Sequence, residues 1–318
     1  MNQINQTQTK SNAFILFGVV ACFILSGFAA LLYQTAWMRQ FSLVFGTSEL
    51  AVAAVLSAYM GGLALGASIA ARWTDRVTRP VLFYGVLEGG IALAALAVPL
   101  LLKLASLLYI SAFGNQAQPV DASGLGQSFF YFVMAFIVLA IPTTFMGATL
   151  PLLTKYVVQS KEQIGTRVGL LYATNTFGAI GGTVVAGFVL LPLLGLNGTV
   201  YVGAAINLLV FLIAAWIAKS IDHDVLSKAD LSSAKLGAGA DDDSVVNNPA
   251  SKPSRRLWIL PIMLLSGANS FIYEVLWTRL LGHVLGGSIT AFSTMLAGFL
   301  SGIAIGSAVA SRFAKTRR

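Results

Sequence analysis

The feature that most constrains this chain is an internal duplication. When the 318-residue sequence is shifted by 240 positions, 26–72 aligns without a gap on 266–312, with 15 identities over 47 positions. Two copies so far apart, each predicted below to be a pair of membrane helices, indicate a duplicated membrane bundle. The identities include, in the numbering of the first copy, Ser26, Gly27, Tyr33, Trp37, Arg39, Gly46, Ser48, Gly62, Gly66 and Arg72.

The composition is that of a membrane protein. Hydrophobic residues make up 57% of the chain and charged residues 10%, whereas about a quarter of the residues of a soluble domain are charged. The apolar residues form runs of about 18 or more, the length that crosses roughly 30 Å of hydrocarbon. The net charge of +8 does not indicate a nucleic-acid partner, because the basic residues lie at the ends of apolar runs. We therefore expect an all-α integral membrane protein with the lipid bilayer as its partner.

The apolar runs predict about eight membrane helices, arranged as six, a linker and two. A polar loop at 111–128 and a tight turn at 196–199 separate neighbouring helices, and Pro142 and Pro151 predict a kink or a break in the fourth helix. The predicted helices are 13–37, 48–71, 81–102, 129–157, 168–194, 200–218, 257–277 and 288–310.

Polar segments flank these helices. The Gln- and Asn-rich N-terminus and the Ser-, Ala-, Gly- and Asp-rich segment before the second copy contain too little apolar surface to fold alone, so we expect both to be disordered. The predicted organisation is a disordered N-terminus 1–12, a six-helix bundle 13–218, a disordered linker 219–256, a two-helix repeat 257–310 and a basic tail 311–318.

The positions of the basic residues predict the orientation. Of the 20 Lys and Arg residues, all but Arg39, Lys103 and Arg279 fall on one side of the predicted helices. Positive residues are concentrated in cytoplasmic loops, so we expect both termini and the linker to be cytoplasmic. An even number of spans agrees with this orientation.

The loop after the second predicted helix reads Ala71-Arg72-Trp73-Thr74-Asp75-Arg76-Val77-Thr78-Arg79. It resembles a cytoplasmic signature of the major facilitator superfamily, Gly-x-x-x-Asp-Arg-x-Gly-Arg. Asp75, Arg76 and Arg79 match that signature, whereas Ala71 and Thr78 stand where the family usually has glycine. The resemblance implies a conformational latch formed by these charges. The alternative is a short charged turn that only fixes orientation.

One aromatic motif occurs in both copies. Tyr and Trp near a helix end, followed by Arg, are typical of an anchor at the membrane interface. Against this interpretation, both arginines lie on the outer side, contrary to the charge bias. The alternative is a site at the outer mouth formed jointly by the two copies. The two occurrences are Tyr33-x-x-x-Trp37-x-Arg39 and Tyr273-Glu274-x-x-Trp277-x-Arg279.

Glu88 is the carboxylate that the sequence places deepest in a predicted membrane helix. An ionisable group at such a depth is costly unless it is paired or hydrated. It is therefore a candidate for proton coupling or cation binding, with a structural carboxylate as the alternative. Asn175, Asn207 and Asn269 are intramembrane amides that favour interhelical hydrogen bonds.

Other patterns favour structural roles. The glycines spaced four apart let helix backbones approach closely. Cys22 is the only cysteine, and His223 and His283 lie in different regions. We therefore expect no catalytic residue, no cofactor and no metal site in this chain. The glycine patterns are Gly62-x-x-x-Gly66, Gly178-x-x-x-Gly182 and Gly298-x-x-x-Gly302-x-x-x-Gly306.

Two further motifs join the duplicated segment, Pro142-x-x-x-Met146-Gly147-Ala148-Thr149-Leu150-Pro151 and Gly169-Leu170-Leu171-Tyr172-Ala173-x-Asn175-Thr176-x-Gly178. With these motifs, the chain resembles the membrane part of the fused major-facilitator/spermidine synthase-like proteins of bacteria, over nearly its whole length. The resemblance implies a major-facilitator-like bundle in the bacterial inner membrane.

The resemblance also implies what is missing. Members of the family carry an aminopropyltransferase-like domain after the membrane part, with a Gly-rich loop for decarboxylated S-adenosylmethionine and a catalytic Asp. Neither has a counterpart here, so no catalytic residue is carried over. Because 311–318 corresponds to the start of the loop after the eighth helix, we expect a truncated second half. A separate chain that supplies further helices and the enzyme domain, or a second copy, would then complete it.

The expected function is a transporter-like membrane module that handles or senses a polyamine or another small cation. Glu88 and Glu274 are its principal acidic candidates. Further contact candidates are Arg39, Arg279, Tyr33, Tyr273 and Asn175. The alternatives are a stand-alone small transporter that acts as an oligomer and a non-transporting anchor or scaffold.

Overall fold

The computed structural model describes residues 2–46, 49–113, 125–157, 164–233, 259–286 and 289–316. Every element within these ranges is helical, as the composition predicts. A bilayer favours helices because each backbone N–H and C=O is then paired within its own segment. The elements are α1 Asn2–Phe45, α2 Glu49–Trp73, the 3-10 turn η1 Thr74–Arg76, α3 Pro80–Phe113, α4 Leu125–Val157, α5 Ile164–Val185, the π-helical η3 Ala186–Leu190, α6 Leu191–Ser233, α7 Ile259–Leu285 and α8 Ile289–Thr316.

Six stretches of the described residues are long and apolar enough to cross a membrane. One of them, 167–221, is 55 residues long and contains most of α5 and α6 together. α7 is not among the six, and its sequence includes Asn269, Glu274 and Arg279. The chain therefore has the helices of a membrane protein, and the count of eight spans stays a prediction.

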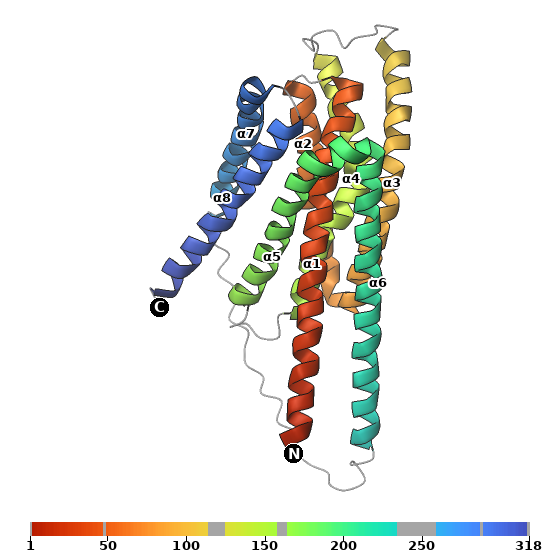
Figure 1. Ribbon diagram of the computed structural model, residues 1–318, viewed down its shortest axis with the longest axis vertical. Coiled ribbons are helices and arrows are strands. Elements are labelled where there is room, and N and C mark those ends of the chain that lie inside the picture. The colour runs from red at the N-terminus through yellow and green to blue at the C-terminus, as the bar shows by residue number, and fades with distance from the viewer. Residues whose placement is uncertain are drawn as a thin grey trace.

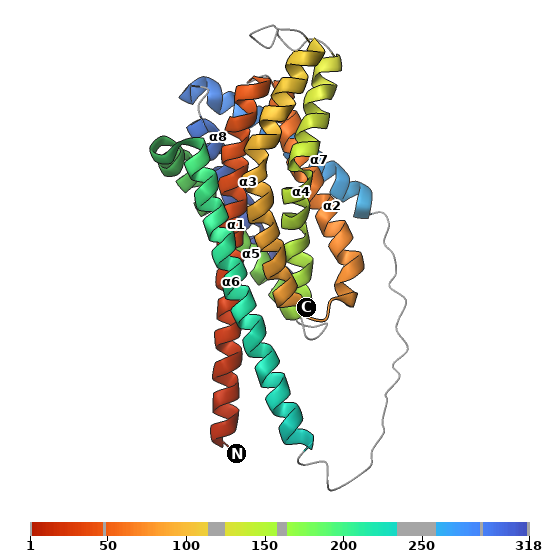
Figure 2. The ribbon, with the colours of Figure 1, turned by 90° about the vertical axis from the view of Figure 1, so that its right-hand side faces the viewer.

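Helices α1 to α6 form one bundle with α1 near its centre (Figures 1 and 2). α2 packs along α4, α3 packs against α4 and α6, and α1 lies against α5 and α6. Most of the buried apolar side chains of α1 to α4 belong to one core cluster. α1 and α6 extend beyond the other helices at the end where the N-terminus lies (Figures 1 and 2).

Both extensions differ from the sequence-based expectation. α1 begins at Asn2, within the segment 1–12 that was expected to be disordered, and α6 continues to Ser233, past the predicted start of the linker at 219. Extending a helix that is already nucleated costs far less than starting one, so polar residues can follow the apolar run. The remainder of the predicted linker, 234–256, lies outside the described residues.

Two predicted interruptions of the helices also differ from the structure. The chain turns at Gly195 (φ 67°, ψ −171°), just before the predicted turn at 196–199, which is helical. A positive φ is readily adopted only by glycine, so Gly195 is the residue that lets α6 leave the direction of α5. α4 is one helix through Pro142 and Pro151, so of the expected kink or break the break was wrong, and the kink stays a prediction.

The duplication is visible in the backbone. α1 and α7 both end at a glycine with positive φ, 82° at Gly46 and 73° at Gly286, and these two positions align in the repeat. A left-handed glycine commonly ends a helix because it has no Cβ to clash. The second pair, α7 and α8, lies at one side of the bundle, where α8 contacts α5 and α7 contacts α2 (Figure 1).

Glycines set the spacing of the first six helices, as predicted. A Cβ added at Gly66 would lie 1.9 Å from the carbonyl oxygen of Thr144 in α4, and one at Gly182 would lie 2.0 Å from that of Phe28 in α1. In α8 the corresponding stripe is open, since a Cβ added at Gly302 would meet nothing within 4 Å. The same pattern therefore packs a helix in the first copy and packs none of the described helices in the second.

Candidate functional site

Glu88 lies at the contact of three helices. Its side chain, on α3, is fully buried. Asn207 Nδ2 of α6 donates a hydrogen bond to Glu88 Oε2, and the hydroxyl groups of Ser26 on α1 and Tyr84 on α3 interact with the same carboxylate. The expectation of an interhelical hydrogen bond from Asn207 is therefore confirmed. Tyr84 also donates to the carbonyl oxygen of Cys22 at 3.2 Å, which ties α3 to α1.

The polar cluster around Glu88 is incompletely satisfied. Among the described residues, neither Glu88 Oε1 nor Asn207 Oδ1 has a hydrogen-bond partner. Two buried oxygen atoms without donors are costly in an apolar interior. A proton on the carboxylate, a water molecule or a cationic ligand would each remove that cost.

Three aromatic side chains lie next to one another in the core. Tyr33 stacks on Trp37 with 5.1 Å between ring centroids and 12° between planes, and Trp37 lies 6.4 Å from Tyr59 of α2. All three are buried. Burial disfavours the anchor interpretation for the first copy, because its Tyr and Trp pack within the protein core and present no surface to lipid headgroups.

Glu274 is the acidic candidate of the second copy. It is buried although it lies on α7, where most side chains are exposed, and its Oε1 has no partner among the described residues. Its carboxylate interacts electrostatically with Tyr59, as that of Glu88 does with Tyr33. We call Glu88, Tyr33, Trp37, Tyr59 and Glu274 the carboxylate–aromatic series.

The outer-mouth site proposed from sequence is not assembled as expected. Tyr33 is 0% exposed, whereas its counterpart Tyr273 is 49% exposed, so the two tyrosines do not share one surface. Arg39 and Arg279 are both exposed. Of the second copy's candidates, only Glu274 is buried.

The loop between α2 and α3 is held by a residue that the sequence analysis missed. Lys155 of α4 donates hydrogen bonds to the carbonyl oxygens of Thr74 and Val77, the latter at 3.1 Å. The latch candidates Asp75, Arg76 and Arg79 are exposed. The guanidinium carbon of Arg76 lies 5.9 Å from the ring centroid of Trp73. Their role as a latch stays a prediction.

Asn175 lies where α5 crosses α1. A Cβ added at Gly27 would be 2.7 Å from the side-chain oxygen of Asn175 and 2.2 Å from its carbonyl oxygen. Asn175 is half-buried and Asn269 is exposed. The contact of Asn175 with α1 favours a packing role over a ligand contact.

Sequence patterns hold some signal for the residues that were missed. Tyr84 is four positions before Glu88, which places both on one face of α3. Gln34 is the position in the first copy that aligns with Glu274, and it is also buried with an unpartnered Nε2 atom. Within the described ranges, no three His, Cys, Asp or Glu side chains gather as they would around a metal ion.

No protein-family model, no curated protein and no solved structure matches this chain.

Proposed function

We propose that this chain is the membrane module of a spermidine synthase-like assembly, a major-facilitator-like bundle that binds a polyamine or a similar organic cation and moves it across the bacterial inner membrane. The observation that supports the proposal is the carboxylate–aromatic series. It combines two buried carboxylates, each with an oxygen that lacks a partner among the described residues, with three adjacent aromatic rings, and each carboxylate interacts electrostatically with one of the outer two rings.

The chemistry of that series suits an elongated cation with amino groups at both ends. A carboxylate is the natural partner of an ammonium group, and pairing removes the cost of burying either charge alone. The methylene groups between the amines would pack on Tyr33, Trp37 and Tyr59. Aromatic faces also attract cations, which favours an amine over a neutral ligand of the same shape.

The two ends of the series belong to different parts of the molecule. Glu88 lies in the six-helix bundle, whereas Glu274 lies on the α7–α8 pair, which contacts that bundle less extensively than the bundle helices contact one another. Movement of α7–α8 against the bundle would separate the carboxylates and open the site. Rocking of one repeat against another is the usual way in which transporters alternate access.

A non-transporting anchor is the second candidate function. The exposed large side chains of α7, among them Leu264, Leu265 and Leu280, favour it, because such a surface also suits attachment to another membrane chain. A separate chain with an aminopropyltransferase-like domain, or a second copy of this one, is the partner that the sequence resemblance implies.

Direct binding tests the proposal. Spermidine binding to purified protein would be measured by isothermal titration calorimetry, with Glu88→Gln and Glu274→Gln as test variants. Each variant keeps the side-chain shape and removes one charge. We expect each to weaken binding at least tenfold, about 1.4 kcal/mol, and to abolish spermidine flux into proteoliposomes. Glu49→Gln, which removes the same charge at the first residue of α2, is the matched control and should leave both unchanged.

The outcomes separate the candidate functions. Binding that depends on both carboxylates, together with flux, supports transport. Binding without flux supports a polyamine sensor or an anchor. If spermidine does not bind, or binds equally well to Glu88→Gln, the carboxylate–aromatic series is structural and the proposal is wrong.

A further inference from the structure

The outward face of α8 carries a row of small residues that none of the described helices covers. The residues of this row lie four positions apart, so they share one side of the helix, and all of them are exposed. A Cβ added at any of the three glycines would meet nothing within 4 Å. α8 also diverges from α5 toward its C-terminal end (Figure 1). We call this set the α8 row, and its members are Thr294, Gly298, Gly302 and Gly306.

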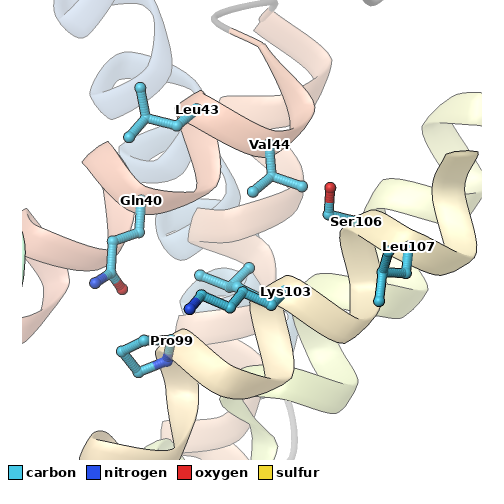
Figure 3. Close-up of a pocket in the computed structure, with 8 residues that line it drawn as sticks. Gln40, Leu43, Val44, Pro99, Lys103, Ser106 and Leu107 are labelled. Atoms are coloured by element: carbon cyan, nitrogen blue, oxygen red, sulfur yellow. The ribbon is translucent and has the colours of Figure 1, made fainter.

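Other outward surfaces of the bundle carry large apolar side chains. The groove between α1 and α3, for example, is lined by Gln40 and Lys103 together with Leu43 and Leu107, and both leucines are mostly exposed (Figure 3). Lipid tails solvate such side chains as well as protein does. A row of glycines offers lipid little side-chain area, whereas it lets the backbone of another helix approach closely. The composition of the α8 row therefore favours a helix as its neighbour.

The first copy of the repeat shows how the aligned residues pack. Gly62 and Gly66 align with the last two glycines of the α8 row, and both lie against α4. A Cβ added at Gly147 of α4 would be 2.1 Å from the carbonyl oxygen of Leu63 in α2, so α4 also meets α2 through a glycine. The duplication therefore repeats a helix-packing surface, and only its first occurrence has a partner among the described helices.

A second molecule of this chain offers a matching surface. Its α4 is already packed on α2 and its α5 on α1, so neither helix is free to cover the α8 row of the first molecule. Its own α8 row is open and has the same shape. Two molecules inserted into a bilayer in the same orientation hold their α8 helices parallel, and a two-fold axis along the membrane normal brings the same face of each together.

We propose that this chain forms a two-fold pair in the membrane through the α8 rows of two molecules. The glycines of each helix lie against the backbone of the other, which is the packing of membrane helices with glycine every four residues. The two six-helix bundles then lie on opposite sides of the paired α8 helices. The pair goes beyond the proposed transport function and does not depend on it.

Disulfide cross-linking of the full chain in liposomes tests the pair. Cys22 is the only cysteine, so a Cys22→Ala chain carries a single thiol wherever a new cysteine is placed. Ile305→Cys places it beside the α8 row, at an exposed position. Leu65→Cys is the matched control, because Leu65 is the exposed residue that aligns with Ile305 in the first copy. Under mild oxidation at a low protein-to-lipid ratio, Ile305→Cys should form a covalent dimer at least tenfold faster than Leu65→Cys.

Two leucine substitutions locate the contact. Gly302→Leu, added to the Ile305→Cys chain, fills the row and should slow cross-linking at least tenfold. Gly267→Leu adds the same side chain at an open glycine of α7 and should leave the rate unchanged. In dilute detergent, where single molecules predominate, Gly302→Leu should unfold like the wild type, because a Cβ there meets nothing within 4 Å.

Four results would overturn the α8 pair. Two are equal cross-linking of Ile305→Cys and Leu65→Cys, and an unchanged rate in Gly302→Leu. The third is an equal loss in Gly267→Leu, which would extend the contact to α7. The fourth is a loss of single-molecule stability in Gly302→Leu, which would show that the row is covered within one molecule. None of these assays contains a polyamine, so their outcome is independent of the transport function.

Discussion

The two copies of the repeat have similar sequences and contrasting environments. In the first copy, Trp37 is 0% exposed, and Gly62 and Gly66 lie against α4. In the second, Trp277 is 57% exposed and Gly302 has open space beside it. Both copies nevertheless turn through a left-handed glycine at the same position.

This contrast distinguishes the structure that a helix pair forms from its own sequence from the packing that depends on neighbouring helices. The turn and the two helices form in both copies, because they depend on local sequence. Burial of the aromatic residues and close approach at the glycines occur only where α4, α5 and α6 are present to provide the opposing surfaces. The second copy is thus a pair of the same design, and the described helices leave most of its packing surface uncovered.

The largest difference between the copies should be seen at the aligned glycines Gly66 and Gly306. Gly66→Leu forces a side chain into the carbonyl of Thr144, and overpacking of this kind costs roughly 3 kcal/mol or more. Gly306→Leu should change stability by less than about 0.5 kcal/mol. Unfolding by sodium dodecyl sulfate, followed by circular dichroism, measures both. A similar cost at Gly306 would mean that another chain covers α8 in the sample.

Truncation of the aligned tryptophans should give the next largest difference in stability between the copies. Trp37→Ala removes a fully buried ring that contacts Tyr33 and Tyr59, and such truncations cost about 3–5 kcal/mol. Trp277→Ala should cost less than about 1 kcal/mol, because its ring packs on few protein atoms. The same unfolding assay applies. Equal losses at the two positions would contradict the difference in burial.

Removal of the hydrogen bonds that Lys155 donates at the end of the first copy should have a moderate effect on stability. Lys155 fixes the loop after α2 through Thr74 and Val77, whereas in the second copy α8 continues as a helix to Thr316. Lys155→Met should destabilise the fold by about 1.5–3 kcal/mol, the range for hydrogen bonds to charged groups. It should also speed amide hydrogen exchange at 74–79. Unchanged exchange there would show that Lys155 does not hold the loop.

The smallest expected effect concerns the phenol of Tyr59, which aligns with Phe299. Its hydroxyl donates to the carbonyl oxygen of Ala30 at 3.1 Å. Tyr59→Phe therefore removes one interhelical hydrogen bond, worth about 0.6 kcal/mol in a membrane protein. Phe299→Tyr is the reciprocal control and should not stabilise the fold. A gain there would reveal an acceptor beside α8.

Several features were correctly predicted because they depend on nearby residues. The helical class follows from apolar runs, the backbone of which must be paired within hydrocarbon. The duplication predicted two similar hairpins, and both have the glycine turn. The depth of Glu88 predicted that it would require partners, and Asn207 is one.

Other features depend on residues far apart in the chain. Asn207 is 119 positions from Glu88, and Lys155 is 78 positions from Val77. One sequence without aligned relatives does not pair such distant positions. Tyr33 and Tyr273 show the same limit of a single sequence. Because they belong to the same motif, both were expected at the membrane interface, whereas the structure buries Tyr33 and exposes Tyr273.

The sequence by itself determined that the chain forms membrane helices, that one helix pair occurs twice, and where that pair turns. Backbone hydrogen bonding and the conformational freedom of glycine are local, so a sequence is enough to define them. The tertiary structure alone decided which copy is buried, that Glu274 is buried on a mostly exposed helix, and that Gln40 and Lys103 line one groove. Those outcomes depend on which helix surfaces pack together. Lipid tails solvate every apolar helix face equally well, so the apolar pattern of one helix does not determine which face is buried against protein.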